Sequence, residues 1–161
     1  MKAIKLNGRF FTTLILLLAV FCACKKERRA NTSIIGAWTT SMNYDNSNVS
    51  EQTYKFNADS TVRISTTIHD KATGVMLGYQ YLSNGKFRLN GDQLKLYQLN
   101  SSYRNDVNTT FSPSAQLLPL PSDTLRTYTI KISADGTFFH FQYPPCPINA
   151  NCAPELIYKK Q

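Results

Sequence analysis

The strongest constraint on the fold is a series of short segments in which apolar and polar residues alternate. The clearest covers residues 61–68, where Val62, Ile64, Thr66 and Ile68 share one face and mostly polar side chains share the other. Side chains of an extended strand point alternately to opposite faces, so this spacing is typical of an antiparallel strand with one buried face. The segment therefore predicts a β-sheet that covers a core on one side.

Similar segments follow one another through most of the chain after residue 33. Clusters of Asn, Asp, Gly and Ser separate them, and Asn84-Gly85 is a strong hairpin signal. We expect strands at residues 34–40, 53–56, 61–68, 75–82, 86–89, 93–97, 124–132, 137–143 and 156–159. With eight or nine short strands and no convincing amphipathic helix, the pattern predicts an all-β fold. An antiparallel barrel, which would protect the strand edges, and a β-sandwich are the two arrangements that fit.

Residues 100–122 interrupt this rhythm. They hold many Ser and Asn, three prolines and one apolar patch at residues 117–121. A loop of this length within a compact domain is uncommon and often functional, although a plain surface insertion has the same composition. The apolar patch favours a lid or a contact surface, because exposed apolar clusters usually have a partner.

The N-terminus carries a different signal. Lys2, Lys5 and Arg9 precede an uncharged, mostly apolar run at residues 10–24. A positive start and a short apolar run are the signature of a secretory signal peptide. The run is shorter than the roughly 20 residues that cross a bilayer, which disfavours the alternatives of a membrane anchor or a buried helix.

The end of this run, Phe21-Cys22-Ala23-Cys24, resembles the lipobox of bacterial lipoproteins. The resemblance implies cleavage after Ala23 and acylation of Cys24, although Phe21 and Cys22 depart from the usual pattern. Two or more acyl chains give stable anchoring. The chain then divides into a signal peptide at 1–23, a lipidated polar tether at 24–33 and a single domain at 34–161. This predicts a lipid-anchored protein of the cell envelope, at the outer membrane, with the membrane face left open.

The net charge is positive but not concentrated in any part of the sequence. Loss of residues 1–23 removes three of the 18 basic residues and leaves a net charge of +5. The tether and the C-terminus hold several of the remainder, and we expect no basic stripe through the domain. Solvation and attraction to an anionic membrane explain this charge better than nucleic-acid binding, which we do not expect of an exported chain.

Two cysteines remain in the predicted mature domain. Cys146 and Cys152 are close in sequence, and an exported pair with this spacing is most simply a disulfide. A metal site is the alternative, but it needs further ligands, and no His or Cys lies near. We therefore predict a disulfide and no metal.

Residue patterns that support catalysis are missing. His69 and His140 belong to no metal-ligand spacing and no recognisable triad. The sequence also lacks a Gly-x-Ser-x-Gly elbow, a glycine-rich phosphate loop and a close pair of carboxylates. We therefore expect no enzymatic activity and no cofactor.

Three short motifs occur along the domain: Ile35-Gly36-Ala37-Trp38, the hairpin at residues 54–62 with its Asp59-Ser60-Thr61 turn, and the hairpin at residues 128–139 with Asp135-Gly136-Thr137. Together they resemble the lipocalin-like domains of small Bacteroidetes envelope lipoproteins. The resemblance implies an up-and-down barrel of eight or nine strands in which Gly36 and Trp38 close one end. Such a barrel is wide enough to hold either side chains or one small ligand.

Two functions follow from that choice. In the first, the barrel binds a small apolar or amphipathic ligand, with residues 100–122 as a lid. The candidate ligand contacts are aromatic, although such residues are more often packed core: Tyr54, Phe56, Tyr79, Tyr81, Phe139 and Phe141. In the second, the barrel is filled and acts as a structural or protein-interaction module of the envelope, with residues 100–122 as its contact surface.

Overall fold

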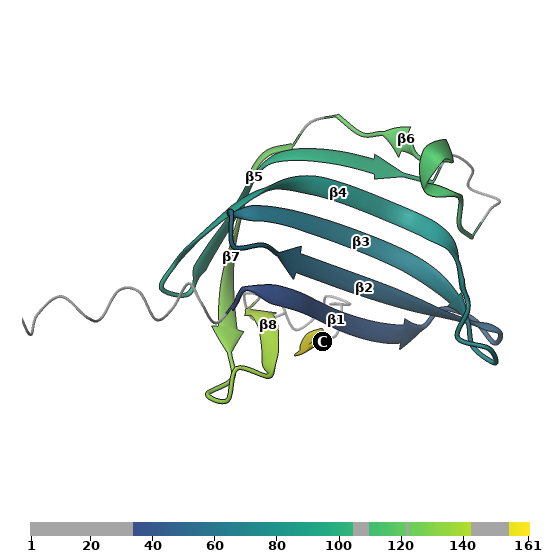
Figure 1. The fold of residues 1–161 in the computed structure, drawn as a ribbon, viewed down its shortest axis with the longest axis horizontal. Coiled ribbons are helices and arrows are strands. Elements are labelled where there is room, and N and C mark those ends of the chain that lie inside the picture. The colour runs from purple at the N-terminus through teal and green to yellow at the C-terminus, as the bar shows by residue number, and fades with distance from the viewer. Residues whose placement is uncertain (1–33, 105–109, 122, 143–154) are drawn as a thin grey trace, which may run out of the picture.

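The computed structural model describes residues 34–104, 110–121, 123–142 and 155–161 (Figure 1). The predicted lipidation site Cys24 and the predicted disulfide between Cys146 and Cys152 lie outside these residues. The strands are β1 (Gly36–Asn43), β2 (Asn48–Phe56), β3 (Thr61–Asp70), β4 (Met76–Asn90), β5 (Gln93–Tyr103), β6 (Leu118–Pro119), β7 (Asp123–Ile132), β8 (Phe138–Gln142) and β9 (Ile157–Lys160). Within the described residues, no helix is long and apolar enough to span a membrane.

The strands form one sheet that closes on itself. Neighbouring strands pair in the order β4-β3-β2-β1-β9-β8-β7-β5, and a further β4–β5 pairing completes the ring. Every pairing is antiparallel, and the short β6 lies outside the ring on β5. This confirms the all-β, up-and-down antiparallel barrel. Every ring strand has a partner on both sides within residues 36–160, so the barrel needs no strand from the first 33 residues.

Local turn chemistry fixes several of the connections. In the β2–β3 turn, the Asn57 amide donates to the Thr61 carbonyl at 2.9 Å, and the Asp59 carboxylate accepts from the Thr61 amide and hydroxyl. In the β4–β5 turn, Gly91 has a φ of 60°, which glycine adopts without a Cβ penalty. These turns were predicted at these positions.

The hairpin predicted at Asn84-Gly85 is wrong. Both residues lie inside β4, a continuous strand with a bulge beside them in its pairing with β5. A Cβ atom on Gly85 would lie 2.7 Å from Leu99 Cδ2 and 3.0 Å from the Tyr97 carbonyl oxygen. Glycine is therefore present because the backbone of β5 and the side chain of Leu99 approach β4 closely, which is a known use of glycine within strands.

The prediction of an irregular segment at residues 100–122 is wrong in part. Residues 100–103 continue β5, and Leu118–Pro119 form β6 against the end of β5. Between them, Ser112 forms an isolated bridge with Tyr79 of β4, with two backbone hydrogen bonds of 2.8 and 2.9 Å. The described part of this segment is thus attached to the barrel through β4 and β5.

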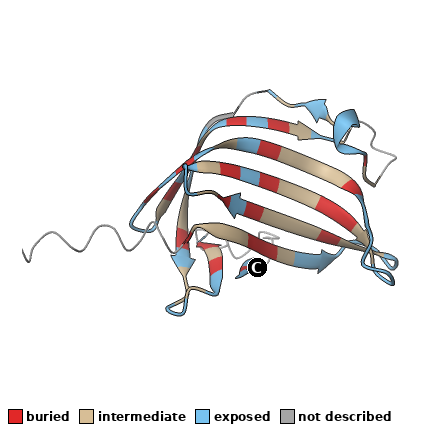
Figure 2. Cartoon of the chain, viewed as in Figure 1, coloured by how far each residue is buried: buried red, intermediate tan, exposed pale blue. Residues whose placement is uncertain are grey.

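The core lies inside the ring, toward the end where β1 begins (Figure 2). We call this end the closed end and the opposite end the mouth. The mouth contains the β1–β2 and β3–β4 connections, whereas the chain enters the barrel at the closed end, where Gly36 pairs with Phe56.

Candidate functional site

The closed end of the interior is filled by aromatic side chains. Trp38 is fully buried, and its indole nitrogen donates to the Ile34 carbonyl at 2.7 Å. The edge of its ring meets Phe139 at a centroid distance of 5.3 Å. The Lys160 ammonium lies 5.1 Å from the centroid of the Trp38 ring, and a Cβ on Gly36 would lie 3.1 Å from Lys160 Cε. Trp38, Gly36 and Lys160 therefore lie together at the end of the barrel where β1 begins.

The six predicted ligand residues fall into two groups. Tyr54, Phe56, Phe139 and Phe141 are all buried, and their rings contact one another at centroid distances of 5.3 to 6.3 Å. They form the packed floor of the interior. Tyr81 lies higher and is half-buried, with its hydroxyl 3.0 Å from Ser101 Oγ. Tyr79 pairs with Ser112 near the mouth and does not belong to the aromatic cluster.

Strand register arranges the interior in layers, and the first of them includes Tyr54 of the floor. One layer crosses five strands and changes from apolar to polar on the way: Trp38, Tyr54, Ile64, Ser83 and Ser101. Ser83 and Ser101 are almost completely buried, and Ser101 donates to Ser83 at 2.9 Å. Among the described residues, no buried side-chain nitrogen or oxygen lacks a hydrogen-bond partner.

The next layer toward the mouth is polar. Its members on β1 to β4 are half-buried: Thr40, Gln52, Thr66 and Tyr81. The Tyr158 hydroxyl donates to the Gln52 side-chain oxygen, so the polar layer is joined to the floor by a hydrogen bond. The floor is buried, whereas this layer is half-buried.

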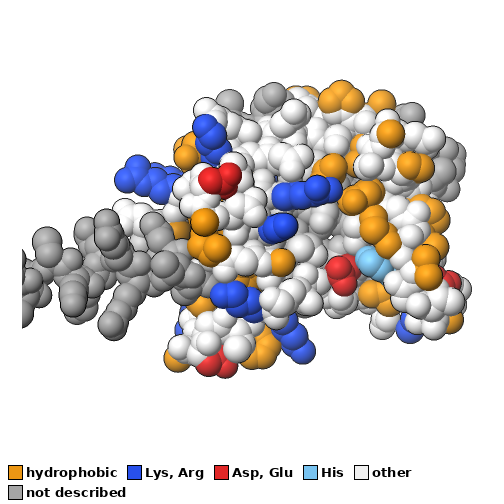
Figure 3. Space-filling view, viewed as in Figure 1, with side chains coloured by type: hydrophobic (Ala, Val, Ile, Leu, Met, Phe, Trp, Pro, Cys, Tyr) orange, Lys and Arg blue, Asp and Glu red, His pale blue; other side chains and the backbone are white. Residues whose placement is uncertain are grey.

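The mouth carries apolar side chains beside the polar turns of Asp45 and Asp70. Ile68 is fully buried, and a Cβ on its register neighbour Gly78 would lie 2.9 Å from Phe111 Cδ2. Phe111 therefore packs against β4 at Gly78. Most of the exposed large apolar residues lie around the same end: Met42, Tyr44, Val75, Met76, Leu77, Tyr103 and Leu118. We call these seven residues the apolar rim, and the orange side chains at the right-hand end of Figure 3 belong to this region.

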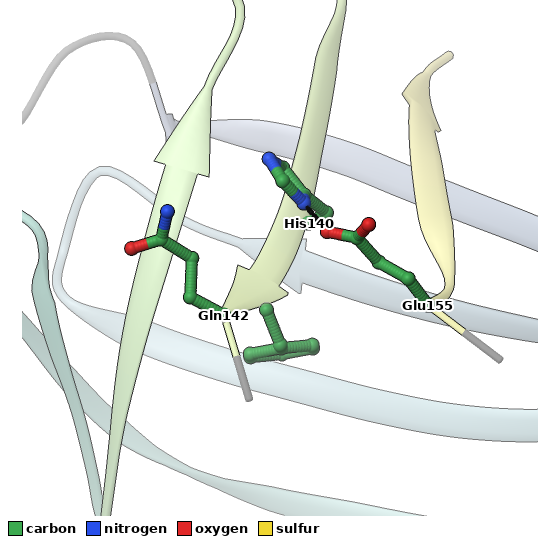
Figure 4. Close-up of a pocket in the computed structure, with 4 residues that line it drawn as sticks. His140, Gln142 and Glu155 are labelled. Carbon is green, nitrogen blue, oxygen red and sulfur yellow. Dashed lines mark hydrogen bonds and ion pairs between the residues drawn. The ribbon is translucent and has the colours of Figure 1, made fainter. Parts of the chain in front are cut away.

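A second candidate site lies outside the barrel, around His140 on β8. The His140 Nδ1 atom contacts the Glu155 carboxylate, and Figure 4 shows the two side chains pointing toward each other. Two neighbouring hollows of about 300 and 340 Å³ share these residues, and the larger is also lined by Lys131, Phe138 and Ile157. An exposed His–Glu pair of this kind contributes little to stability.

Within the described residues, no hydroxyl or thiol is hydrogen-bonded to His140. The nearby Ser133 hydroxyl donates to Asp135 at 2.5 Å and accepts from the Phe138 amide at 2.9 Å, so the hydroxyl is held in the β7–β8 turn. A nucleophile must instead be within hydrogen-bond reach of its base. The described residues also contain no group of three His, Cys, Asp or Glu side chains that could hold a metal ion.

Sequence reasoning missed the polar interior. Gln52, Ser83 and Ser101 lie at positions that alternate with outward-facing residues, and polar residues at such positions were a usable signal. Which of these residues lie side by side depends on the register between strands, and the sequence pattern does not give that register. No family model matches the chain, and no curated protein or solved structure is significantly similar to it. Function is therefore inferred from the residues and their geometry.

Proposed function

We propose that the protein is an envelope lipoprotein whose barrel binds a small amphipathic molecule through its mouth. The observation that carries this proposal is the half-buried polar layer of Thr40, Gln52, Thr66 and Tyr81, which lies between an aromatic floor and the apolar rim. Binding sites for small molecules are typically apolar with a few placed polar groups that fix orientation. The polar head of the ligand would contact this layer, and its apolar part would contact Phe111 and the apolar rim.

The proposal includes anchoring through Cys24, on the strength of the lipobox resemblance and the apolar run before it. The tether would leave the barrel at the closed end, where β1 begins, so it would not cross the mouth. Residues 110–112 support the role of a lid, because they attach to β4 by backbone hydrogen bonds and bring Phe111 against Gly78.

Native mass spectrometry tests the ligand proposal directly. A chain of residues 25–161 keeps every described residue, and we expect an extra mass that organic extraction removes and added dodecanoate restores. The double variant Thr40→Val and Thr66→Val keeps side-chain size but removes two hydroxyls from the polar layer. We expect this variant not to bind dodecanoate, whereas Thr127→Val on the outer face of β7 should bind it as the unaltered chain does. An unaltered apo mass with dodecanoate present, or equal binding by all three chains, would refute the amphipathic site.

A second candidate function is contact with an envelope protein through residues 100–122. Tyr103 and Leu118 favour it, because these two exposed side chains are direct partners in the β5–β6 pairing. Replacement of both by Ser should abolish crosslinking of such a partner at this surface in intact cells, whereas Thr127→Val on the outer face of β7 should leave the crosslinking unchanged.

A further inference from the structure

The fold gathers basic residues that are far apart in sequence onto one outer face. Lys55 on β2 is the direct cross-strand partner of Arg63 on β3, and Arg88 on β4 is the direct partner of Lys95 on β5. Lys86 joins the two pairs, since it lies two residues from Arg88 and two residues from Asn84, the partner of Arg63. We call these five exposed residues the basic band. The expectation that no basic stripe crosses the domain is therefore wrong.

The basic band is continuous across four strands. With adjacent strands about 4.8 Å apart, it extends roughly 14 Å across the sheet. In the described part of the chain, none of its five members forms an ion pair. The two acids within β2 to β5, Glu51 and Asp70, lie toward the mouth. Figure 3 shows the blue Lys and Arg side chains over the middle and left of this face.

This arrangement has an energetic cost. Like charges directly opposite each other on a sheet destabilise it, and the barrel contains two such pairs side by side. Asp59 and Asp92 lie in the turns that follow β2 and β4 and offset part of the charge. The Asp59 carboxylate already accepts two hydrogen bonds from Thr61, so it is committed to its turn. A surface rich in phosphate groups would relieve the repulsion that remains.

We propose that the basic band docks on an anionic membrane and lays the barrel on its β2–β5 side. The occupant follows from charge complementarity and from where the chain enters the barrel. Lys55 pairs in register with Ala37 of β1, at the point where the tether meets the barrel. Residues 24–35 can extend to about 40 Å, so the membrane that holds an acylated Cys24 would be within reach of the basic band. This inference rests on the proposed membrane attachment and identifies the protein surface that contacts the membrane alongside the lipid anchor.

Charge reversal within the basic band gives a sharp test. In Arg63→Glu and Lys95→Glu combined, each new carboxylate faces a cation, so both repulsive pairs become attractive and the barrel should melt at the same temperature or higher. The control, Lys71→Glu and Lys159→Glu combined, changes net charge equally but alters exposed residues outside the band. The chains cover residues 25–161, which lack Cys24, so the result does not depend on acylation.

Co-sedimentation with vesicles is the measurement. We expect the unaltered chain to bind phosphatidylcholine vesicles that contain about 30 mol% phosphatidylglycerol and not phosphatidylcholine alone, with binding that weakens as salt rises. The band variant should bind at least tenfold more weakly, because each substituted residue repels the anionic surface that the basic residue attracted, and the control less than threefold more weakly. Failure of the unaltered chain to bind, or equal losses in both variants, would overturn the proposal. Palmitate labelling of Cys24 in cells tests the anchor separately.

Discussion

The close approach of Leu99 to Gly85 predicts whether Gly85→Ala raises or lowers the free energy of unfolding. In an unhindered strand, replacement of Gly by Ala stabilises a protein by about 0.4–1 kcal/mol, because it restricts the unfolded chain. Here the new Cβ would lie 2.7 Å from Leu99 Cδ2 and 3.0 and 3.2 Å from the carbonyl oxygens of Tyr97 and Gln98. Overpacking of this kind costs about 1–3 kcal/mol, so Gly85→Ala should destabilise the barrel.

A double-mutant cycle separates the two sources of that cost. Leu99 is almost completely buried, and Leu99→Ala alone should cost about 2–5 kcal/mol through the cavity it leaves. If the side chain of Leu99 is the main obstacle, Gly85→Ala in that background should cost at least about 1 kcal/mol less than it does alone. Rescue should stay incomplete, because the carbonyl oxygens of β5 belong to the backbone and remain in place.

Urea unfolding of the four chains measures this cycle. Gly91→Ala is the matched control, because Gly91 has open space around it and a φ of 60°, so Ala there carries backbone strain without a steric clash. We expect Gly91→Ala to show no coupling to Leu99→Ala. A stabilised Gly85→Ala, or additive effects with Leu99→Ala, would refute the account of Gly85 as a close-approach residue.

Three further predictions follow from the same structure. Trp38→Ala should cost about 3–5 kcal/mol in urea unfolding, because it removes the buried ring at the closed end. The side-chain hydrogen bond from Thr61 is the main cause that lowers the pKa of the Asp59 carboxyl. The side-chain hydrogen bond from Ser133 is the main cause that lowers the pKa of the Asp135 carboxyl. The stabilisation of the fold by these ionised carboxylates is present above the ordinary aspartate pKa and is lost as pH falls through the lowered pKa. The melting temperature of Asp59→Asn should therefore fall less on acidification than that of the unaltered chain. The two cysteines of residues 146–152 should resist maleimide until reduced, and reduction should cost about 2 kcal/mol.

The parts of the fold that sequence predicted well are those decided by neighbouring residues. The turn at Asn57 to Thr61 depends on side chains within four positions of one another, and β3 shows its alternation within a single segment. The hairpin signal at Asn84-Gly85 failed because the reason for that glycine lies on another strand, in Leu99. Turn residues therefore predict turns only where no distant element competes for the same position.

The candidate site was less predictable, because its residues meet only through register. Ser83 and Ser101 are 18 positions apart, yet their hydroxyls share a buried hydrogen bond. Composition indicated aromatic residues as ligand contacts, and four of them form a packed floor. The polar layer that carries the proposed function consists of ordinary Thr, Gln and Tyr residues, which are common in strands and do not stand out in sequence.

The basic band and the apolar rim lie on different parts of the same barrel. Both could therefore face one membrane at the same time. A barrel that rests on its β2–β5 side has its axis along the membrane plane, so its mouth faces sideways. The apolar rim would then lie close to the lipid surface, where an amphipathic molecule could pass from the bilayer to the polar layer without crossing bulk water. Charge reversal in the band should therefore slow transfer of dodecanoate from anionic vesicles to the barrel, while dodecanoate affinity in vesicle-free solution stays unchanged. If the band variant and its control take up dodecanoate from the vesicles at equal rates, docking through the basic band does not assist ligand transfer.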